Sequence, residues 1–406
     1  MSSLAMREQR KKAQPIRSGH YPAKELCSQC GLCDTHYVQQ VRSACAFIHQ
    51  QIDQLELQTH GRSRDQETGT ASTPTDTDYF GIYDRMLTAR KQDPVPGAQW
   101  SGIVSTIGMR ALETGLVEAV VCVQADPEDR FKPRPILARH PEEVLAARVN
   151  KPTLSPNLSV LELVEQSNCQ RLLVIGVGCQ VQALRAVQAD LGLQELYVLG
   201  TPCVDNVSRE GLQTFLETTS RSPDTVVHYE FMQDFRIHFK HSDGSVEKVP
   251  FFGLNTKALK DVFAPSCLSC FDYVNALADL VVGYMGSPLG WQWLVVRNPR
   301  GQVLLDLVAD QLETQPVISR GNRHAAVQQG IAAYDQALTL PMWLAQIMGV
   351  VIEKIGPQGL EYARFSIDSH FTRNYLFVRR HYPERVEDHV PGFAQRIVSQ
   401  YKLPEN

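Results

Sequence analysis

Apolar positions follow two different periods along this 406-residue chain, and the first clear pattern begins near residue 100. From Ser101, small polar residues lead into apolar positions at helical spacing, and Gly115 closes that stretch. Compact apolar runs, typical of buried strands, then alternate with further helical patterns. The predicted order is helix 101–114, strand 117–123, helix 158–166, strand 171–176, helix 181–191 and strand 196–199. This alternation predicts a parallel α/β sheet.

The period changes to strict alternation after residue 225. Apolar positions there alternate with Arg236, His238 and Lys240, and Asp243-Gly244 is typical of a hairpin turn, so we predict a β-rich insertion over residues 226–252. The remaining predicted elements are strands 278–286 and 293–296, a hairpin turn at 298–301, and helices 322–356 and 388–401.

Charge and hydropathy argue against two classes of protein, nucleic-acid binders and membrane-spanning proteins. The formal net charge is −4, and the main basic cluster, Arg7 to Arg17, lies in an N-terminal arm, so a nucleic-acid binder is not expected. We interpret that arm as a disordered tail, with an acidic protein partner or a targeting remnant as alternatives. The apolar stretch 338–355 is interrupted by Pro341, Glu353 and Lys354, which predicts a soluble helix and no membrane span.

Ten cysteines without a secretory apolar region indicate metal or redox chemistry in a reducing compartment. A C-x2-C-x2-C triplet followed by a more distant cysteine is typical of a [4Fe–4S] cluster, whereas structural zinc usually takes two separated pairs. The triplet lies among polar residues, which argues against four unrelated buried thiols. The first predicted metal site consists of Cys27, Cys30, Cys33 and Cys45.

A second set of cysteines follows the predicted strands. Cys179 and Cys203 come after successive strands and are expected at the same edge of the sheet, and a C-x2-C pair follows later in the chain. We predict a second cluster held by Cys179, Cys203, Cys267 and Cys270. The cysteines that lack ligand spacing, and that we interpret as plain buried thiols, are Cys122 and Cys169.

Several turns offer backbone N–H groups and glycines to a phosphate-bearing cofactor. A helix start rich in Ser, Gly and Thr is either an anion site or an ordinary cap, and Lys151 is either a phosphate contact or a surface lysine. Val181 replaces the third glycine of a dinucleotide fingerprint, so no nicotinamide site is predicted, and no nucleophile elbow is present. The candidate cofactor residues are Ser101, Gly102, Ser105, Thr106, Lys151, Ser155, Gly176, Gly178 and Gln180.

Together these patterns predict an α/β protein in four parts. Residues 1–78 form an N-terminal arm and [4Fe–4S] segment, with 60–78 as a polar linker or mobile loop. Residues 79–225 form the αβ flavin-binding region, 226–310 a β-rich part with the second cluster ligands, and 311–406 a helical C-terminal region.

Four motifs resemble the β-subunit family of deazaflavin-reducing hydrogenases and formate dehydrogenases. The motifs span Gly178–Leu184, Thr201–Asn206, Cys267–Cys270 and Ala278–Gly283, and the likeness covers about residues 80–380. With Cys-x2-Cys-Gly-Leu-Cys-Asp near the N-terminus and the run Ala119–Pro127, the chain is similar to the chlorophyll-metabolism branch of that family.

This resemblance implies FAD, two [4Fe–4S] clusters, reduced ferredoxin as donor and a tetrapyrrole acceptor. It also implies a cyanobacterial cytoplasmic or plastid stromal protein, with a place at the thylakoid periphery as an alternative, and suggests a homotrimer. The implied reaction is reduction of the 8-vinyl group of divinyl (proto)chlorophyllide to ethyl. Candidate aromatic and apolar walls for the flat substrate, which core packing would equally explain, are Phe251, Phe252, Tyr284, Met285, Trp291 and Trp293.

Three alternatives remain at this stage. The first is reduction of 7-hydroxymethyl chlorophyll a. The hydroxymethyl reductases are expected to carry an insertion in the connection Ser287–Trp293, and its shortness in this chain argues against that substrate. The second is a non-catalytic flavin or electron-transfer subunit of a larger complex. The third is a zinc-stabilised binding protein, which would be colourless.

Overall fold

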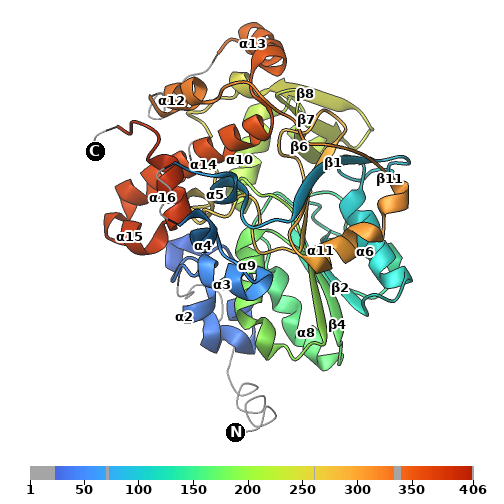
Figure 1. Cartoon of the computed structure of the whole chain (residues 1–406). Coiled ribbons are helices and arrows are strands. Elements are labelled where there is room, and N and C mark those ends of the chain that lie inside the picture. The colour runs from blue at the N-terminus through green and yellow to red at the C-terminus, as the bar shows by residue number, and fades with distance from the viewer. Residues whose placement is uncertain (1–22, 70–72, 260, 333–339, 405–406) are drawn as a thin grey trace.

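The computed structural model describes residues 23–69, 73–259, 261–332 and 340–404, and an eight-stranded mixed sheet lies at its centre (Figure 1). The strand order is β11-β1-β10-β9-β5-β4-β2-β3. The inner neighbours β2, β4, β5 and β9 pair in parallel, and the flanking pairs are antiparallel. The strands are β1 (Arg85–Lys91), β2 (Ala119–Ala125), β3 (Pro133–Ala138), β4 (Arg171–Gly176), β5 (Glu195–Gly200), β9 (Leu280–Gly283), β10 (Gln292–Val296) and β11 (Leu312–Gln315). The predicted parallel α/β core is therefore confirmed.

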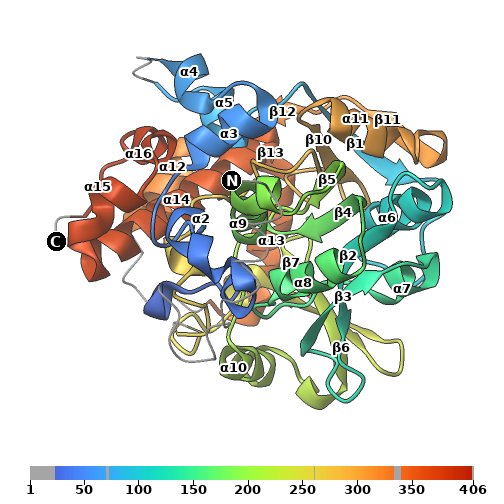
Figure 2. The ribbon, with the colours of Figure 1, turned by 90° about the horizontal axis from the view of Figure 1, so that it is seen from below.

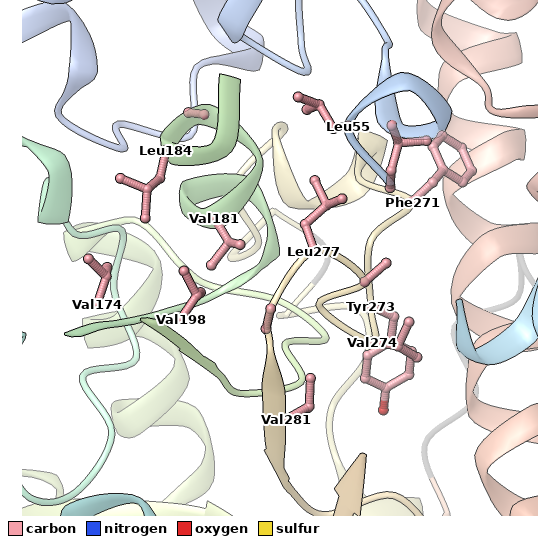
Figure 3. Close-up of a cluster of buried hydrophobic side chains, with 14 of the residues drawn as sticks. Leu55, Val174, Val181, Leu184, Val198, Phe271, Tyr273, Val274, Leu277 and Val281 are labelled. Carbon is pink, nitrogen blue, oxygen red and sulfur yellow. The ribbon is translucent and has the colours of Figure 1, made fainter. Parts of the chain in front are cut away.

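Both faces of this sheet are buried, because successive strand residues point to opposite sides. Val120 and Leu173 pack beneath α6 (Ile103–Glu113), α7 (Pro141–Ala146) and α11 (Pro299–Asp306). Val121 and Val174 face the other way, toward α9 (Gly178–Val187). Figure 3 shows this second core, in which Val181 and Leu184 of α9 lie against strand side chains and the 271–277 loop.

A separate three-stranded antiparallel sheet follows the αβ units: β6 (Val226–Phe231), β7 (Arg236–His241) and β8 (Val246–Pro250). Ile237 and Phe239 are fully buried against α10 (Arg209–Thr219), as the alternation predicts. α13 (Met342–Ile355) lies over β8 at the same end of the molecule (Figure 1). The insertion is thus an independent layer, whereas β9 and β10 return to the main sheet.

Helices from the N-terminal and C-terminal parts of the described chain lie together on the α9 face. Figure 2 shows α2 and α3 beside α9, with the C-terminal helices next to them. The helices here are α2 (Val41–Ala44), α3 (Ile52–His60), α4 (Arg64–Thr68), α5 (Asp76–Phe80), α12 (His324–Ala332), α14 (Leu360–His381), α15 (Val386–His389) and α16 (Gly392–Val398). α8 (Leu161–Gln166) and two-residue strands β12 (Ser319–Arg320) and β13 (Gln358–Gly359) complete the order. Among the helices that the structure describes, none is long and apolar enough to cross a bilayer.

Three sequence expectations were wrong. Residues 298–301 start α11 rather than a hairpin, because the Asn298 side chain caps the helix by accepting from Gly301 N at 3.1 Å and Pro299 follows it. No strand was predicted between residues 123 and 158, yet residues 133–138 form β3. Residues 60–78 are not a linker where they are described: they form α4 and α5, and Arg64 is buried in an ion pair with Glu56 at 2.7 Å. The basic arm lies outside the described residues.

Candidate functional site

The four N-terminal cysteines surround a single cavity. Cys27, Cys30, Cys33 and Cys45 all line it, and Cys179 of α9 completes its wall. Gly31 lets this loop dock: its φ is +93°, and a Cβ there would lie 2.6 Å from Pro156 O and from Ser159 N. The first predicted metal site is therefore brought together by folding.

The environment of these thiols suits a cationic centre. Burial, followed by the neighbouring Cys27 and Cys45, raises the pKa of Cys33 to about 12, and burial likewise raises the pKa of Cys30. Such thiols stay protonated at neutral pH unless bound metal replaces the proton. Gln29 N donates to Cys27 Sγ at 3.3 Å, a contact that stabilises a thiolate.

The second set of cysteines also converges. Cys179 begins α9 after β4, Cys203 follows β5, and Cys267 and Cys270 come from a short 3-10 turn. Burial, followed by the charges of the other three cysteines of this set, raises the pKa of Cys179. Asn206 N donates to Cys267 Sγ at 3.2 Å. Cys179 also interacts with Cys30, so the two sets are neighbours.

Helix α14 fixes the second set. Asn374, fully buried, donates from Nδ2 to the carbonyls of Cys267 and Cys270 at 2.8 and 2.6 Å. Arg373 forms a bidentate pair with Asp205, at 2.8 and 2.9 Å, in the loop that carries Cys203. One helical turn therefore holds both chain segments. The sequence contains no motif that marks these residues, because their partners are distant in the chain: Asn374 binds backbone carbonyls 104 and 107 positions away, and Arg373 binds a carboxylate 168 positions away.

The thiols are not arranged as the ligands of a single ion. In the described ranges, no three His, Cys, Asp or Glu side chains lie close enough to share one metal ion. A tetrahedral zinc site would need its sulfurs about 2.3 Å from the metal and thus nearly in contact with one another. The first group of thiols lines a cavity together with Cys179, through which the second group adjoins the first. Cys122 and Cys169 are buried apart from both groups, as expected.

The predicted cofactor residues gather at the carboxyl edge of the parallel strands, but many are occupied by protein contacts. Ser101 Oγ donates to Gln292 Oε1 and accepts from Lys91 N at 3.3 Å. Gly102, with φ +82°, precedes α6, and Thr106 Oγ1 donates to its carbonyl at 3.0 Å. Ser105 is buried on the same first turn.

The Lys151 side chain binds backbone carbonyls of the segment that follows α7. Its ammonium donates to the carbonyls of residues 147, 148 and 149 at 2.9, 3.1 and 3.0 Å, and burial lowers its pKa to about 8. Gln180 Nε2 donates to Ser155 O at 2.9 Å, while Gln180 Oε1 accepts from Val177 N at 3.2 Å. Lys151 is therefore not a free surface lysine.

The two glycines after β4 serve packing. A Cβ on Gly178 would lie 2.6 Å from Asp272 Oδ2, and one on Gly176 would lie 3.2 Å from Gln180 Oε1. Packing against Asp272 alone is enough to require glycine at 178, and a role of either glycine in cofactor binding stays a prediction. The glycine pattern alone could not distinguish these two causes.

The candidate substrate walls separate into two groups. Trp293 and Met285 are core residues, 1% and 2% exposed, and Trp293 packs against Phe80, so they cannot line an open surface. Tyr284 lies between Trp100 and Tyr362, with ring centroids 6.4 and 5.9 Å away. Partly exposed aromatics that remain candidates are Phe251, Phe252, Tyr284 and Trp291.

Comparison with known proteins identifies the protein family. Residues 86–162 match the N-terminal family model of the coenzyme F420 hydrogenase/dehydrogenase β subunit, and residues 169–320 match its C-terminal model. Coenzyme F420 hydrogenase subunit β of Methanococcus voltae is 32% identical over 252 residues, covering 59% of this chain and 86% of its own length. The chain belongs to this family.

Two relatives extend over nearly the whole chain. The chloroplastic 7-hydroxymethyl chlorophyll a reductase of rice, Oryza sativa subsp. japonica, is 51% identical over 422 residues, covering 98% of this chain and 88% of the plant protein. An uncharacterised protein of Nostoc sp. is 69% identical over 405 residues and 100% of both chains. Named relatives are thus oxidoreductases, and this chain is one of the chlorophyll-related members.

The fold likeness agrees with the sequence likeness. A chain of the F420-reducing [NiFe] hydrogenase complex from Methanosarcina barkeri matches with TM-score 0.55 and 26% identity, covering 72% of this chain and 91% of that one. The second set of cysteines lies within the family match at 169–320, whereas the first set precedes both matched ranges.

Proposed function

We propose that this protein is an iron–sulfur flavoprotein that reduces the 8-vinyl group of divinyl (proto)chlorophyllide to ethyl, with reduced ferredoxin as donor. The observation that carries the proposal is the convergence of eight cysteines into two adjacent groups, in a chain related over nearly its whole length to a chlorophyll reductase.

The proposed reaction adds two electrons and two protons to a C=C bond, and no atom leaves. Ferredoxin supplies one electron at a time. A bound flavin supplies the capacity to collect two electrons and deliver them as a pair. In this assignment, Cys27, Cys30, Cys33 and Cys45 hold one [4Fe–4S] cluster, and the cysteines at the strand ends hold the other.

The protein's own residues then provide placement. The edge formed by Ser101, Gly102 and the 151–155 segment is the proposed FAD site, because glycine and helix N–H groups there can meet a phosphate. Tyr284 and its aromatic neighbours are the proposed support for a flat macrocycle.

Reduction of 7-hydroxymethyl chlorophyll a is the second candidate, favoured by the 51% identity to the rice enzyme. That reaction also uses two electrons and two protons, but it breaks a C–O bond and releases water. The vinyl reaction is preferred because β9 and β10 are joined directly by residues 284–291, without the insertion expected of hydroxymethyl reductases there. The short connection is thus the feature on which the choice of substrate rests.

The deciding experiment is anaerobic incubation of the reconstituted protein with reduced ferredoxin and each pigment separately, followed by pigment separation. We expect conversion of divinyl chlorophyllide to the 8-ethyl product. Conversion of the hydroxymethyl pigment alone would replace the substrate assignment. Conversion of neither pigment, together with co-purification of a second polypeptide, would support an electron-transfer subunit instead.

Cytoplasmic or stromal location and a homotrimer belong to the same proposal. The chloroplastic rice relative and the cyanobacterial relative support the location. Sedimentation of the purified protein tests the trimer, and a colourless preparation that contains zinc would replace the iron–sulfur assignment.

A further inference from the structure

On the polar face of the small sheet, the side chains contributed by β6 are buried, whereas those of β7 are partly exposed. On β6 and β7, Tyr229 and Phe239 face the core beneath α10. His228 and Glu230, paired across the strands with Lys240 and His238, do not take part in that core. His228 is 5% exposed and Glu230 3% exposed. A buried polar sheet face requires partners.

His228 has none among the described residues. Neither of its ring nitrogens forms a hydrogen bond, although both are shielded from solvent. The nearest charged oxygen, Glu230 Oε2, lies 3.7 Å from His228 Nε2 and is engaged by Lys240 Nζ at 3.1 Å. An unpaired buried imidazole costs about 1–3 kcal/mol, so this arrangement indicates a missing partner.

The same face lies beside the start of α6. Trp100 N, two residues before Gly102, donates to Glu230 Oε1 at 3.4 Å. α6 is an 11-residue helix whose Gly102 cap supplies no side-chain acceptor for the first-turn N–H groups. The buried Trp100 Nε1 is also unpaired. Glu230 therefore links His228 of β6 to the segment that leads into α6.

The local charge is positive. Burial, then Lys240 and Lys151, lowers the pKa of His228 to about 4, so both lysines act on the imidazole. Glu230 is the nearby carboxylate, and Lys240 already pairs with it. The imidazole can donate one hydrogen bond, and the two lysines outnumber the one carboxylate, so a phosphate group is a ligand that suits this place.

We propose that His228 and the N-terminus of α6 together bind the diphosphate of the flavin dinucleotide, so that the β6–β7 sheet forms the second wall of the flavin site. This placement rests on the proposed flavoprotein function. It assigns a binding role to the insertion, which the glycine-rich turns did not indicate. It also explains why a buried histidine tolerates two unpaired nitrogens in the ligand-free chain.

The test compares His228→Ala and His228→Gln with His241→Ala. His241 is a matched control because it is buried in the same sheet but on the opposite face, where Nδ1 pairs with Thr225 Oγ1 at 2.8 Å. Flavin-depleted protein that retains its iron is titrated with FAD, FMN and riboflavin. Iron content and thermal unfolding are measured on each variant.

We expect His228→Ala to weaken FAD binding by about tenfold or more, with a similar loss for FMN and less than about threefold for riboflavin. His228→Gln, which retains an N–H donor, should recover part of the affinity. His241→Ala should bind FAD normally, and iron should be unchanged throughout.

Normal FAD binding by His228→Ala would overturn the placement. An equal loss for riboflavin would overturn the phosphate assignment, and an equal loss in His241→Ala would show a general packing effect instead. Wild-type protein that contains no flavin would overturn the proposed function as well, which separates the two failures.

Discussion

Asn374 offers a selective way to disturb one thiol group and leave the other intact. Its side chain joins Cys267 and Cys270 through their carbonyls, yet it contacts none of the N-terminal cysteines among its hydrogen bonds. Asn374→Ala removes both donors and leaves two carbonyls without that partner in a buried site. We therefore expect the Cys267–Cys270 turn to open.

The magnitude follows from two lost hydrogen bonds. Each contributes about 1 kcal/mol net, and a carbonyl left buried without a partner costs about 1–3 kcal/mol. Allowing for water entering the gap, we expect the closed turn to lose about 2–4 kcal/mol. Asn374→Asp should be worse, because a carboxylate cannot donate and repels both carbonyl oxygens.

The assay is iron per chain after anaerobic purification, read with the electron paramagnetic resonance spectrum of the reduced protein. Wild type should contain about eight irons, and Asn374→Ala about four, with the signal of the N-terminal cluster preserved. The matched control is Arg379→Ala on the same helix, where the guanidinium donates to the Pro404 carbonyl at 2.7 Å, and it should retain all iron. Full iron in Asn374→Ala, or equal loss from both groups, would refute this reasoning.

Three further results are expected. Cys30→Ser should remove about half of the iron while the sheet-edge cluster survives, and an intact protein with only about four irons would contradict the second site. Glu56→Gln should lower the free energy of unfolding by about 3–5 kcal/mol in urea, since it strands the buried Arg64 charge, whereas Glu313→Gln in an exposed pair should change it by less than about 1 kcal/mol. Burial lowers the pKa of His60 to about 3, so below about pH 6.5 the unfolded chain protonates this histidine while the folded protein does not, and stability falls with pH. His60→Gln should reduce this loss of unfolding free energy between pH 6.5 and 4 by up to about 1 kcal/mol per pH unit. A slope equal to that of the wild type would contradict this.

The sequence predicted the parts of the molecule that depend on local pattern. Strand β4 and helix α9 follow from a buried apolar run and a helical period, and the parallel core follows from their alternation. The triplet around Cys30 was recognisable because its ligands are close in the chain. Cys179 and Cys203 could be joined because parallel strands end at one edge.

Features that depend on distant packing could not be predicted in the same way. Strand β3 is rich in Pro and Arg and pairs only because β2 lies beside it. The 60–78 segment has a loop-like composition, yet Arg64 is buried by Glu56 and by the ring of Phe393. Asn374 and His228 have no spacing signature, since the residues that define their roles lie on other elements, distant in the chain.

The docking of Gly31 against the 156–159 segment has a consequence for how the protein matures. The N-terminal loop and Cys179 line one cavity, so the loop can dock in its final position only after β4 and α9 have formed. Translation delivers the thiols in the opposite order: Cys45 emerges long before Cys270 exists. The first four thiols are therefore exposed in the nascent chain to oxidation and to binding of other metal ions. Iron delivery to this protein should succeed when it follows synthesis of the whole sheet, because only then are all eight of these thiols present together.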